Sequence, residues 1–497
     1  MWYRDVGRTL ILPIHLGMPC DGMPVPFERP EFEDAPLLNA YYADKDSIRH
    51  SFAIPGHKND VSLVGDLISA DRPLILNNDM SLPSLGTLRA AEERAARAWG
   101  ADHARFSVNG SSAANQAAMM SMANHGQKVI ISRTLHKSLL FGLINSGAIP
   151  VWVRPEYDVL TGLPCGMSAE TIERALSDNP DAVAVFIGEP AYVGTYGDIS
   201  AVARTCHDYG VPLVVDAAWA AHFGFHPDLP LNALAMGADM MVTSAHKTLP
   251  AFTQSAILFA NGERIDLKRL DKVFDGTQTT SPSVPILASI DAARALMETR
   301  GETLLGEALR GVTVAKQRLS SVEGLGLLAN LQTDPLKLVL HLNGTGKEGR
   351  PIARVLSAHG IEVETANRDI LIPQVTLADS YDDIQMLTDL LLEEFSKDTD
   401  ALPRPVPSSN AWQVDPIMVM SPREAFYSPT EMVPWEIAVG RVSAELVAPY
   451  PPGIPVLAPG EKITLEVMDT LREAIKSGVH IAYATDPTLK RLSAIKD

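Results

Sequence analysis

The chain has 497 residues, of which 46% are hydrophobic, and it carries 42 Lys plus Arg against 60 Asp plus Glu. Its net charge of −18 at pH 7 argues against binding to nucleic acid or to an anionic membrane surface, because both are polyanions. The longest uncharged stretch, residues 106–127, is too rich in Asn, Gln, Ser and His to cross a membrane. The composition is that of a globular protein with a large buried core.

Three isolated cysteines, Cys20, Cys165 and Cys206, show no CxxC spacing. This pattern speaks against a disulfide framework and against a zinc site. The first twenty residues carry an acid early and lack a sustained apolar core, so we expect no signal peptide. These features are typical of a protein in a reducing cytoplasm.

Short apolar runs rich in β-forming residues recur through the first half of the chain, and helical patterns such as residues 168–180 and 198–210 lie between several of them. This alternation predicts an α/β fold with a mainly parallel sheet covered by helices on both faces. In chain order the runs are ARFSV, KVIIS, IPVWV, AVAVFI, PLVVD, MMVTS and SAILF.

The remainder of the chain indicates further domains. A helix-forming tract covers residues 288–321, and the run LPRPVPSSN near residue 405 has the Pro and Ser content of a linker. We therefore expect an N-terminal segment at 1–70, a large α/β domain at 71–300, a small α+β domain at 301–400, a linker at 401–410 and a C-terminal module at 411–497.

Three segments that follow predicted strands could meet at one edge of the sheet. NGSSAANQAAMM places Ser111 and Ser112 at the start of a helix, where free N–H groups favour a phosphate, although a plain serine cap has the same appearance. Asp216 follows a buried run, either as a helix cap or as the partner of a buried cation. TSAHKTLPAF places Lys247 directly after another strand, where an ordinary solvated lysine is the alternative.

Together these segments supply what pyridoxal phosphate requires. The cofactor needs an anion site for its phosphate, a carboxylate for its pyridine nitrogen and an amine that holds its aldehyde as a Schiff base. Asp216 and Lys247 are about one βαβ unit apart, so both can reach the same edge of the sheet.

A set of ordered motifs then resembles the Orn/Lys/Arg decarboxylase family, the fold-type-I basic amino acid decarboxylases that depend on pyridoxal phosphate, in the short form without an N-terminal wing domain. The resemblance covers nearly the whole chain after about residue 35. It implies a fold-type-I enzyme with a seven-stranded sheet that works as a homodimer or a higher homo-oligomer with shared active sites. The motifs are PGHK at 55–58, NGSSAAN, RTLHKS, DAAW, SAHKTL, TQTTSP and the segment 438–461, which ends in APGE.

The resemblance implies a role for individual residues. Lys247 matches the Schiff-base lysine, Asp216 the acid that pairs with the pyridinium, and His136 the imidazole that stacks on the ring, while His246 could take part in proton return. The remaining cofactor positions are Ser111, Ser112 and Ala218, then Ser244 and His246 as neighbours of the phosphate, together with Thr280 and Ser281, which reach the phosphate in the partner subunit.

Substrate recognition is less defined. Glu364 looks like the acid that receives the distal cation of the substrate, and Glu461 belongs to a matching motif without a definite role. Where relatives often read Thr-Pro-Thr-Tyr, this chain has Glu189-Pro190-Ala191-Tyr192, which places a carboxylate and a methyl near the expected cofactor edge and leaves substrate choice open.

The resemblance implies α-decarboxylation of lysine, arginine or ornithine to the corresponding amine in polyamine biosynthesis. Another fold-type-I reaction remains an alternative, either a lyase or an aminotransferase in which Arg368 would clamp the substrate carboxylate. A non-catalytic protein that binds pyridoxal phosphate is a third possibility. No metal, nucleic acid or membrane partner is expected.

Overall fold

A computed structural model describes residues 50–52, 65, 84–158, 161–328, 331–399, 401–404, 414–415, 417–450, 455–476 and 479–496. Most of the expected N-terminal segment, including Cys20 and the PGHK motif at 55–58, lies outside the described residues, as does most of the expected linker. None of the helices in the described ranges has the length and apolar character needed to span a membrane.

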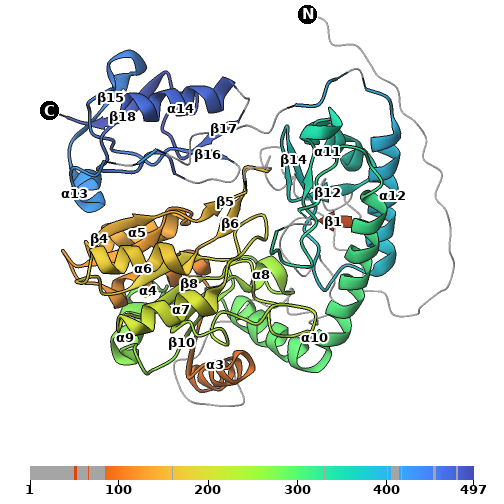
Figure 1. The fold of residues 1–497 in the computed structure, drawn as a ribbon. Helices are drawn as coiled ribbons and strands as arrows, with labels where there is room; N and C mark the ends of the chain where they lie inside the picture. The colour runs from red at the N-terminus through yellow and green to blue at the C-terminus, as the bar shows by residue number, and fades with distance from the viewer. Residues whose placement is uncertain are drawn as a thin grey trace, which may run out of the picture. The chain divides into compact units, whose positions relative to one another are not determined.

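Seven strands form the central sheet in the order β2-β10-β9-β8-β7-β3-β4 (Figure 1). All neighbouring pairs from β4 to β9 are parallel, whereas β10 is antiparallel to both β9 and β2. The predicted mainly parallel sheet is confirmed, with one strand at each of the seven apolar runs. The strands are β2 (His103–Ser107), β3 (Lys128–Ser132), β4 (Ile149–Val153), β7 (Val185–Gly188), β8 (Leu213–Asp216), β9 (Met240–Thr243) and β10 (Ala256–Ala260).

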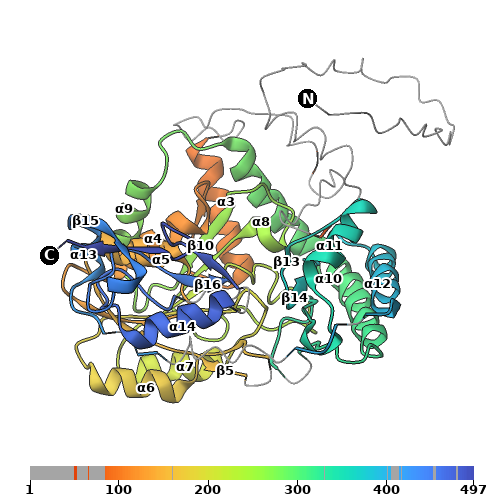
Figure 2. The same cartoon turned by 90° about the horizontal axis from the view of Figure 1, so that it is seen from above.

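Successive residues of a strand point to opposite faces of the sheet, so a strand that is apolar throughout has apolar side chains on both faces. Helices cover both faces and bury these side chains. In β3, Val129 and Ile131 join the buried cluster under α4, α5 and α9, whereas Ile130 joins the cluster under α3, α6, α7 and α10. Figure 2 shows these helices from above. The helices are α3 (Leu85–Trp99), α4 (Gly110–Met122), α5 (Lys137–Ser146), α6 (Ala169–Asp178), α7 (Ile199–Asp208), α9 (Leu267–Thr277) and α10 (Val284–Leu319).

The long helix α10 runs without a break through residue 300, where we expected the large domain to end. The second half of α10 packs against α12 (Tyr381–Ser396). A small antiparallel sheet, in the order β11-β14-β13, lies beside α11 (Gly349–Ala358). The strands of this sheet are β11 (Leu340–His341), β13 (Thr365–Ala366) and β14 (Ile370–Ile372). A separate strand, β12 (Ile361–Val363), pairs in parallel with β1 (His50–Phe52).

The C-terminal module has its own core, in which Leu471, Val433 and Leu492 are buried. It contains α13 (Pro422–Tyr427), α14 (Leu465–Lys476) and the antiparallel pairs β15 (Thr430–Pro434) with β18 (Arg491–Ile495) and β16 (Ala448–Tyr450) with β17 (His480–Ala482). Leu446 and Ala458 join the cluster beneath α4 and α5, so the module packs against that face of the large domain. The division into domains stays a proposal.

A buried ion pair fixes this contact. Arg133, just after β3, donates to both carboxylate oxygens of Glu461 at 2.5 and 2.8 Å, and its Nε donates to the Pro455 carbonyl oxygen at 2.9 Å. Both charged side chains are almost fully buried, at 4% and 1% exposed. Glu461, whose motif alone indicates no definite role, therefore anchors the C-terminal module beside the strand that leads to His136.

Candidate active site

One cavity opens at the carboxyl edge of the parallel strands, where α/β sheets bind their ligands. It has a volume of about 290 Å³, and it collects residues that follow β2, β3, β7, β8 and β9. It is lined by Ser111, Thr134, Leu135, His136, Pro164, Gly188, Pro190, Ala191, Tyr192, Asp216, Ala218, Trp219, Lys247, Glu364 and Tyr483.

Lys247 lies in α8 (Ala245–Thr248), the single helical turn that follows β9. Its amine is 4.2 Å from the centroid of the Trp219 ring, and no hydrogen bond or ion pair joins it to any of the described residues. Burial lowers the pKa of Lys247, while the negative charges of Asp216 and Glu364 oppose that change. A neutral amine is therefore more accessible here than on a solvated lysine.

Asp216 ends β8 and is held in place by two donors. Its Oδ2 accepts a hydrogen bond from Asn115 Nδ2 at 2.7 Å, and its Oδ1 accepts one from the Ala218 backbone N–H at 3.3 Å. The carboxylate and the Lys247 amine line the same cavity, as the cofactor hypothesis requires.

A chain of hydrogen bonds joins Asp216 to His136. Asn115 Nδ2 also donates to Ser138 Oγ at 3.1 Å, and Ser138 Oγ lies 2.8 Å from His136 Nδ1. The Ser138 backbone N–H donates to the same Nδ1 at 3.3 Å, so this nitrogen is an acceptor and the ring proton is on Nε2. Burial lowers the pKa of His136; the charge of Asp216 opposes this, and that of Lys247 adds to it.

Sequence reasoning missed Asn115 and Ser138, although both lie inside quoted motifs. Asn115 is four residues after Ser111 and so shares its face of α4, a spacing that is visible in the sequence. The part played by Ser138 depends on the N-terminus of α5, where the side chain of His136 itself caps the helix.

The N-terminus of α4 provides the anion-binding features. Gly110 begins the helix with a φ of 72°, a left-handed conformation that suits glycine, and the Asn109 side chain makes no capping hydrogen bond. Ser244 Oγ donates to Ser111 Oγ at 2.9 Å, which brings the ends of β2 and β9 together. Ser111 lines the cavity, whereas Ser112 and Ser244 do not.

Two further predicted groups lie away from the cavity wall. His246 donates from Nδ1 to the Ser255 carbonyl oxygen, at 2.9 Å, and burial lowers its pKa. Thr280 and Ser281 lie in an exposed loop between α9 and α10 and do not line the cavity of their own chain.

The part of the cavity near Glu364 comes from separate regions of the chain. Glu364 lies between β12 and β13, and its Oε1 accepts a hydrogen bond from the Tyr192 hydroxyl at 3.5 Å. The Tyr192 ring packs edge-on against Trp219 at 5.1 Å. Tyr483, from the C-terminal module, was not anticipated from the sequence.

Glu189 does not face the cavity. Its oxygens accept hydrogen bonds from the backbone N–H groups of Met167 and Gly197, at 2.6 and 2.8 Å. Burial raises its pKa to about 7, against the effect of these two donors. The expected carboxylate near the cofactor edge is thus a structural group, and Ala191 is the part of this departure that lines the cavity.

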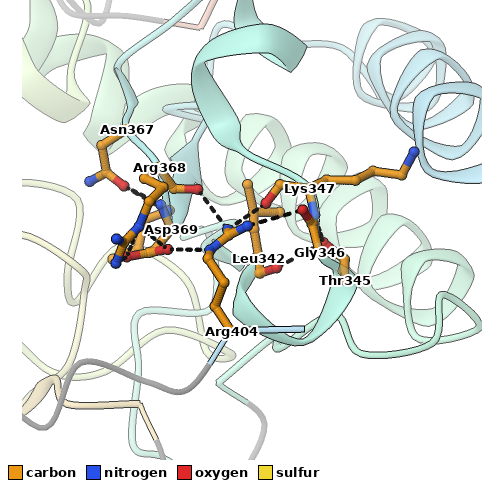
Figure 3. Close-up of polar contacts among 9 residues, drawn as sticks. Leu342, Thr345, Gly346, Lys347, Asn367, Arg368, Asp369 and Arg404 are labelled. Carbon is orange, nitrogen blue, oxygen red and sulfur yellow. Dashed lines mark hydrogen bonds and ion pairs between the residues drawn. The ribbon is translucent and has the colours of Figure 1, made fainter. Parts of the chain in front are cut away.

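Arg368 is committed elsewhere. Its guanidinium donates three hydrogen bonds to the adjacent Asp369, which also accepts from Arg404 (Figure 3). Arg404 further donates to the carbonyl oxygens of Gly346 and Lys347, at 3.0 and 2.6 Å. Since Arg368 does not line the cavity, it is not placed to clamp a substrate carboxylate there.

The arrangement of the sheet defines the class of protein. The chain matches the crystal structure of a lysine decarboxylase from Francisella novicida with a TM-score of 0.70 at 22% identity, over 82% of this chain and 72% of the other. The fold is therefore that of the fold-type-I pyridoxal-phosphate-dependent enzymes.

The sequence comparisons narrow this class to a family. Residues 35–334 match the model of the Orn/Lys/Arg decarboxylase major domain, and residues 407–478 match that of its C-terminal domain. An arginine decarboxylase of Halalkalibacterium halodurans is 35% identical over 94% of this chain and 98% of its own length. An arginine decarboxylase of Bacillus subtilis is 34% identical over 90% of this chain and 94% of its own length. The chain belongs to the Orn/Lys/Arg decarboxylase family of amino acid decarboxylases.

Proposed function

We propose that the protein removes the α-carboxylate of a basic amino acid with pyridoxal phosphate as cofactor, and that arginine is the first substrate to test. The observation that carries this proposal is that the buried Lys247 amine and the Asp216 carboxylate line one cavity. Arginine comes first because the relatives from Halalkalibacterium and B. subtilis are named arginine decarboxylases.

The residues present fit the cofactor. The uncapped N-terminus of α4 suits a phosphate, and Ser111, to which Ser244 donates a hydrogen bond, lines the cavity there. The Lys247 amine, which has no hydrogen-bond partner among the described residues, is available for covalent attachment. Ala218 and His136 would lie against the ring, and Asp216 would hold a proton on its nitrogen.

When bound, the cofactor supplies an aldehyde that captures the substrate amine and a ring that accepts the electron pair left by carbon dioxide. The side chains set the conditions for this reaction. Asp216 stays oriented because Asn115 and the Ala218 N–H hold both of its oxygens. The lowered pKa of His136 favours its neutral form, with the ring proton on Nε2. The Lys247 amine can return a proton to the α-carbon.

Glu364 would receive the distal cation of the substrate. It lines the cavity, its charge is felt at Lys247, and the Tyr192 hydroxyl orients one of its oxygens. A carboxylate of this kind binds a guanidinium or an ammonium group by charge-assisted hydrogen bonds.

The test is a screen of arginine, lysine and ornithine for carbon dioxide release and amine formation, with keto-acid formation measured in parallel. We expect amine and carbon dioxide in equal amounts and no keto acid. Keto acid as the main product would favour an aminotransferase. Bound cofactor without any product would favour a non-catalytic binding protein.

We also propose a homodimer in which Thr280 and Ser281 reach the cofactor phosphate of the partner subunit. Both residues are exposed in the single chain, which supports this placement. Mixing Lys247→Ala subunits with Thr280→Ala, Ser281→Ala subunits should restore activity, because a mixed dimer has one complete site. No recovery after mixing and refolding would contradict shared sites.

A cytoplasmic location and a place in polyamine biosynthesis complete the proposal. The location is supported by the isolated cysteines, of which Cys165 and Cys206 are free thiols in the structure. The pathway follows from the chemistry, since the amines formed from these substrates are polyamine precursors.

A further inference from the structure

Tyr483 connects the C-terminal module to the candidate active site. It follows β17 directly, and it is the one lining residue in the described part of the chain that lies beyond Glu364 in the sequence. The module that carries it is otherwise distant in sequence from every group with a proposed part in the reaction. Its presence in the cavity wall therefore needs a separate explanation.

The backbone of Tyr483 has a φ of 68°, in the left-handed region that residues with a side chain rarely adopt. Such conformations persist where the surrounding structure enforces them, and they concentrate at ligand sites. A glycine would adopt this conformation without strain. The structure thus maintains an unfavourable backbone conformation at the position that brings an aromatic ring into the cavity wall.

The surroundings hold this loop in place. Ala482 pairs with Ala448 between β17 and β16, and Leu446, just before β16, packs into the core cluster of the large domain. The buried pair of Arg133 and Glu461 fixes the same module to the end of β3. The position of the Tyr483 ring is therefore coupled to the large domain by packing and by charge.

The ring is suited to a cation. Tyr483 is 43% exposed, and the ammonium of Lys137 lies 5.8 Å from its ring centroid, within the range of a cation–π contact. Burial raises the pKa of its phenol, so the ring stays neutral across the physiological range. Glu364 supplies the opposite charge within the same cavity.

We propose that Tyr483 is a specificity-determining residue, whose ring receives the distal cation of the substrate together with the Glu364 carboxylate. This inference rests on the proposed function and deepens it. A guanidinium is planar and stacks on aromatic rings, whereas an ammonium is a compact, strongly hydrated charge. The ring of Tyr483 consequently favours arginine over lysine.

Three variants separate the ring from the backbone. Tyr483→Phe keeps the ring, Tyr483→Asn removes it but tolerates the left-handed conformation, and Tyr483→Gly removes it and relaxes the backbone. The matched control is Tyr427→Asn, because Tyr427 is an exposed tyrosine of the same module that does not line the cavity. Each holoenzyme is assayed for kcat and KM with arginine and lysine, for binding of the amine product of arginine by calorimetry, and for melting temperature.

We expect Tyr483→Asn and Tyr483→Gly to raise KM for arginine and to weaken binding of its product by roughly tenfold, with a smaller change for lysine. The kcat value and the cofactor absorbance should stay near those of the parent, because the reacting groups are untouched. Tyr483→Phe and Tyr427→Asn should match the parent. Melting temperatures of the Gly and Asn variants should be equal to or above that of the parent.

Parent-like KM and product affinity in both variants without the ring would overturn the role of Tyr483 alone, provided that the parent releases carbon dioxide. Equal losses for arginine and lysine would overturn the preference for guanidinium. A parent enzyme that decarboxylates neither arginine, lysine nor ornithine would overturn the proposed function and this inference with it. The product-binding measurement does not depend on turnover.

Discussion

The two halves of the cavity are built in different ways. The strand-edge half includes Ser111, His136, Asp216, Ala218 and Lys247, which lie at or just after the ends of strands of one sheet. The composite half includes Ala191, Tyr192, Glu364 and Tyr483, which come from the loop after β7, the junction of β12 and β13, and the loop after β17.

The difference shows how this fold can keep its chemistry while its substrate changes. In the strand-edge half, the hydrogen bonds of the sheet position the backbone. A series of hydrogen bonds between side chains, from Asp216 to His136, holds the functional groups in place. In the composite half, the positions depend on how separate domains pack. Substitutions in the first half should therefore affect cofactor binding and kcat, and substitutions in the second half should affect KM.

The largest effect is expected from Lys247→Ala. Loss of the covalent attachment should abolish the visible absorbance of lysine-bound pyridoxal phosphate and lower kcat by roughly a thousandfold or more. Absorbance spectra and carbon dioxide release measure this change. Lys128→Ala is the control, since Lys128 lies on β3 in an ion pair with Asp181 and should leave both readouts unchanged. A parent-like spectrum for Lys247→Ala would remove the basis of the comparison.

Glu461→Gln tests the connection between the two halves. It leaves the buried Arg133 without a charged partner, so the free energy of unfolding should fall by about 3 kcal/mol or more. Denaturant unfolding measures the loss, and KM should rise because the loop of Tyr483 moves with the module. Glu431→Gln is the control, because its ion pair with Arg441 in the same module is exposed at the Glu431 side. Unchanged stability of Glu461→Gln would show that the module is held by its apolar contacts.

The strand-edge half could be predicted from the sequence because its signals are local. A buried apolar run followed by a polar residue places that residue at the sheet edge, so the sequence alone predicts one site for Ser111, Asp216 and Lys247, which line one cavity. His136 required the family resemblance, because a histidine after a strand has no unique role.

The composite half could not be predicted in this way. Tyr483 reaches the cavity through packing of residues that are far apart in the sequence, and nothing in its local pattern indicates a left-handed backbone. Glu189 is the opposite case, a residue for which the local sequence predicts a position at the cavity that the structure does not show. It was expected near the cofactor edge, but its partners are the backbone amides of Met167 and Gly197, whose positions depend on the folded loop.

Glu364→Gln removes the negative charge of the Glu364 carboxylate from the composite half of the cavity. Removing one charge-assisted interaction should raise KM for the basic amino acid by roughly 10- to 100-fold, with little change in kcat. Cofactor absorbance should persist, because the strand-edge half is intact. Steady-state kinetics and a cofactor titration separate the two effects. Glu362→Gln, two residues earlier on β12, is the matched control, because Glu362 is exposed and does not line the cavity. A fall in kcat at constant KM would place Glu364 with the reacting groups instead.

Ser138→Ala should give the smallest effect of these variants, and it tests whether the protonation of His136 in the strand-edge half influences the rate. Its hydroxyl donates to His136 Nδ1, which stabilises the neutral imidazole, so its loss should raise the pKa of His136 toward the ordinary value of a histidine. The acid limb of the kcat/KM profile should therefore move to higher pH, by about half a unit to one unit. Activity at pH 8 should change little, whereas activity near pH 6 should fall several-fold. Ser146→Ala, at the far end of α5, is the control because it lies outside the cavity wall. A kcat/KM profile that does not shift along the pH axis would mean that His136 contributes only by packing against the cofactor ring and that its protonation does not influence the rate.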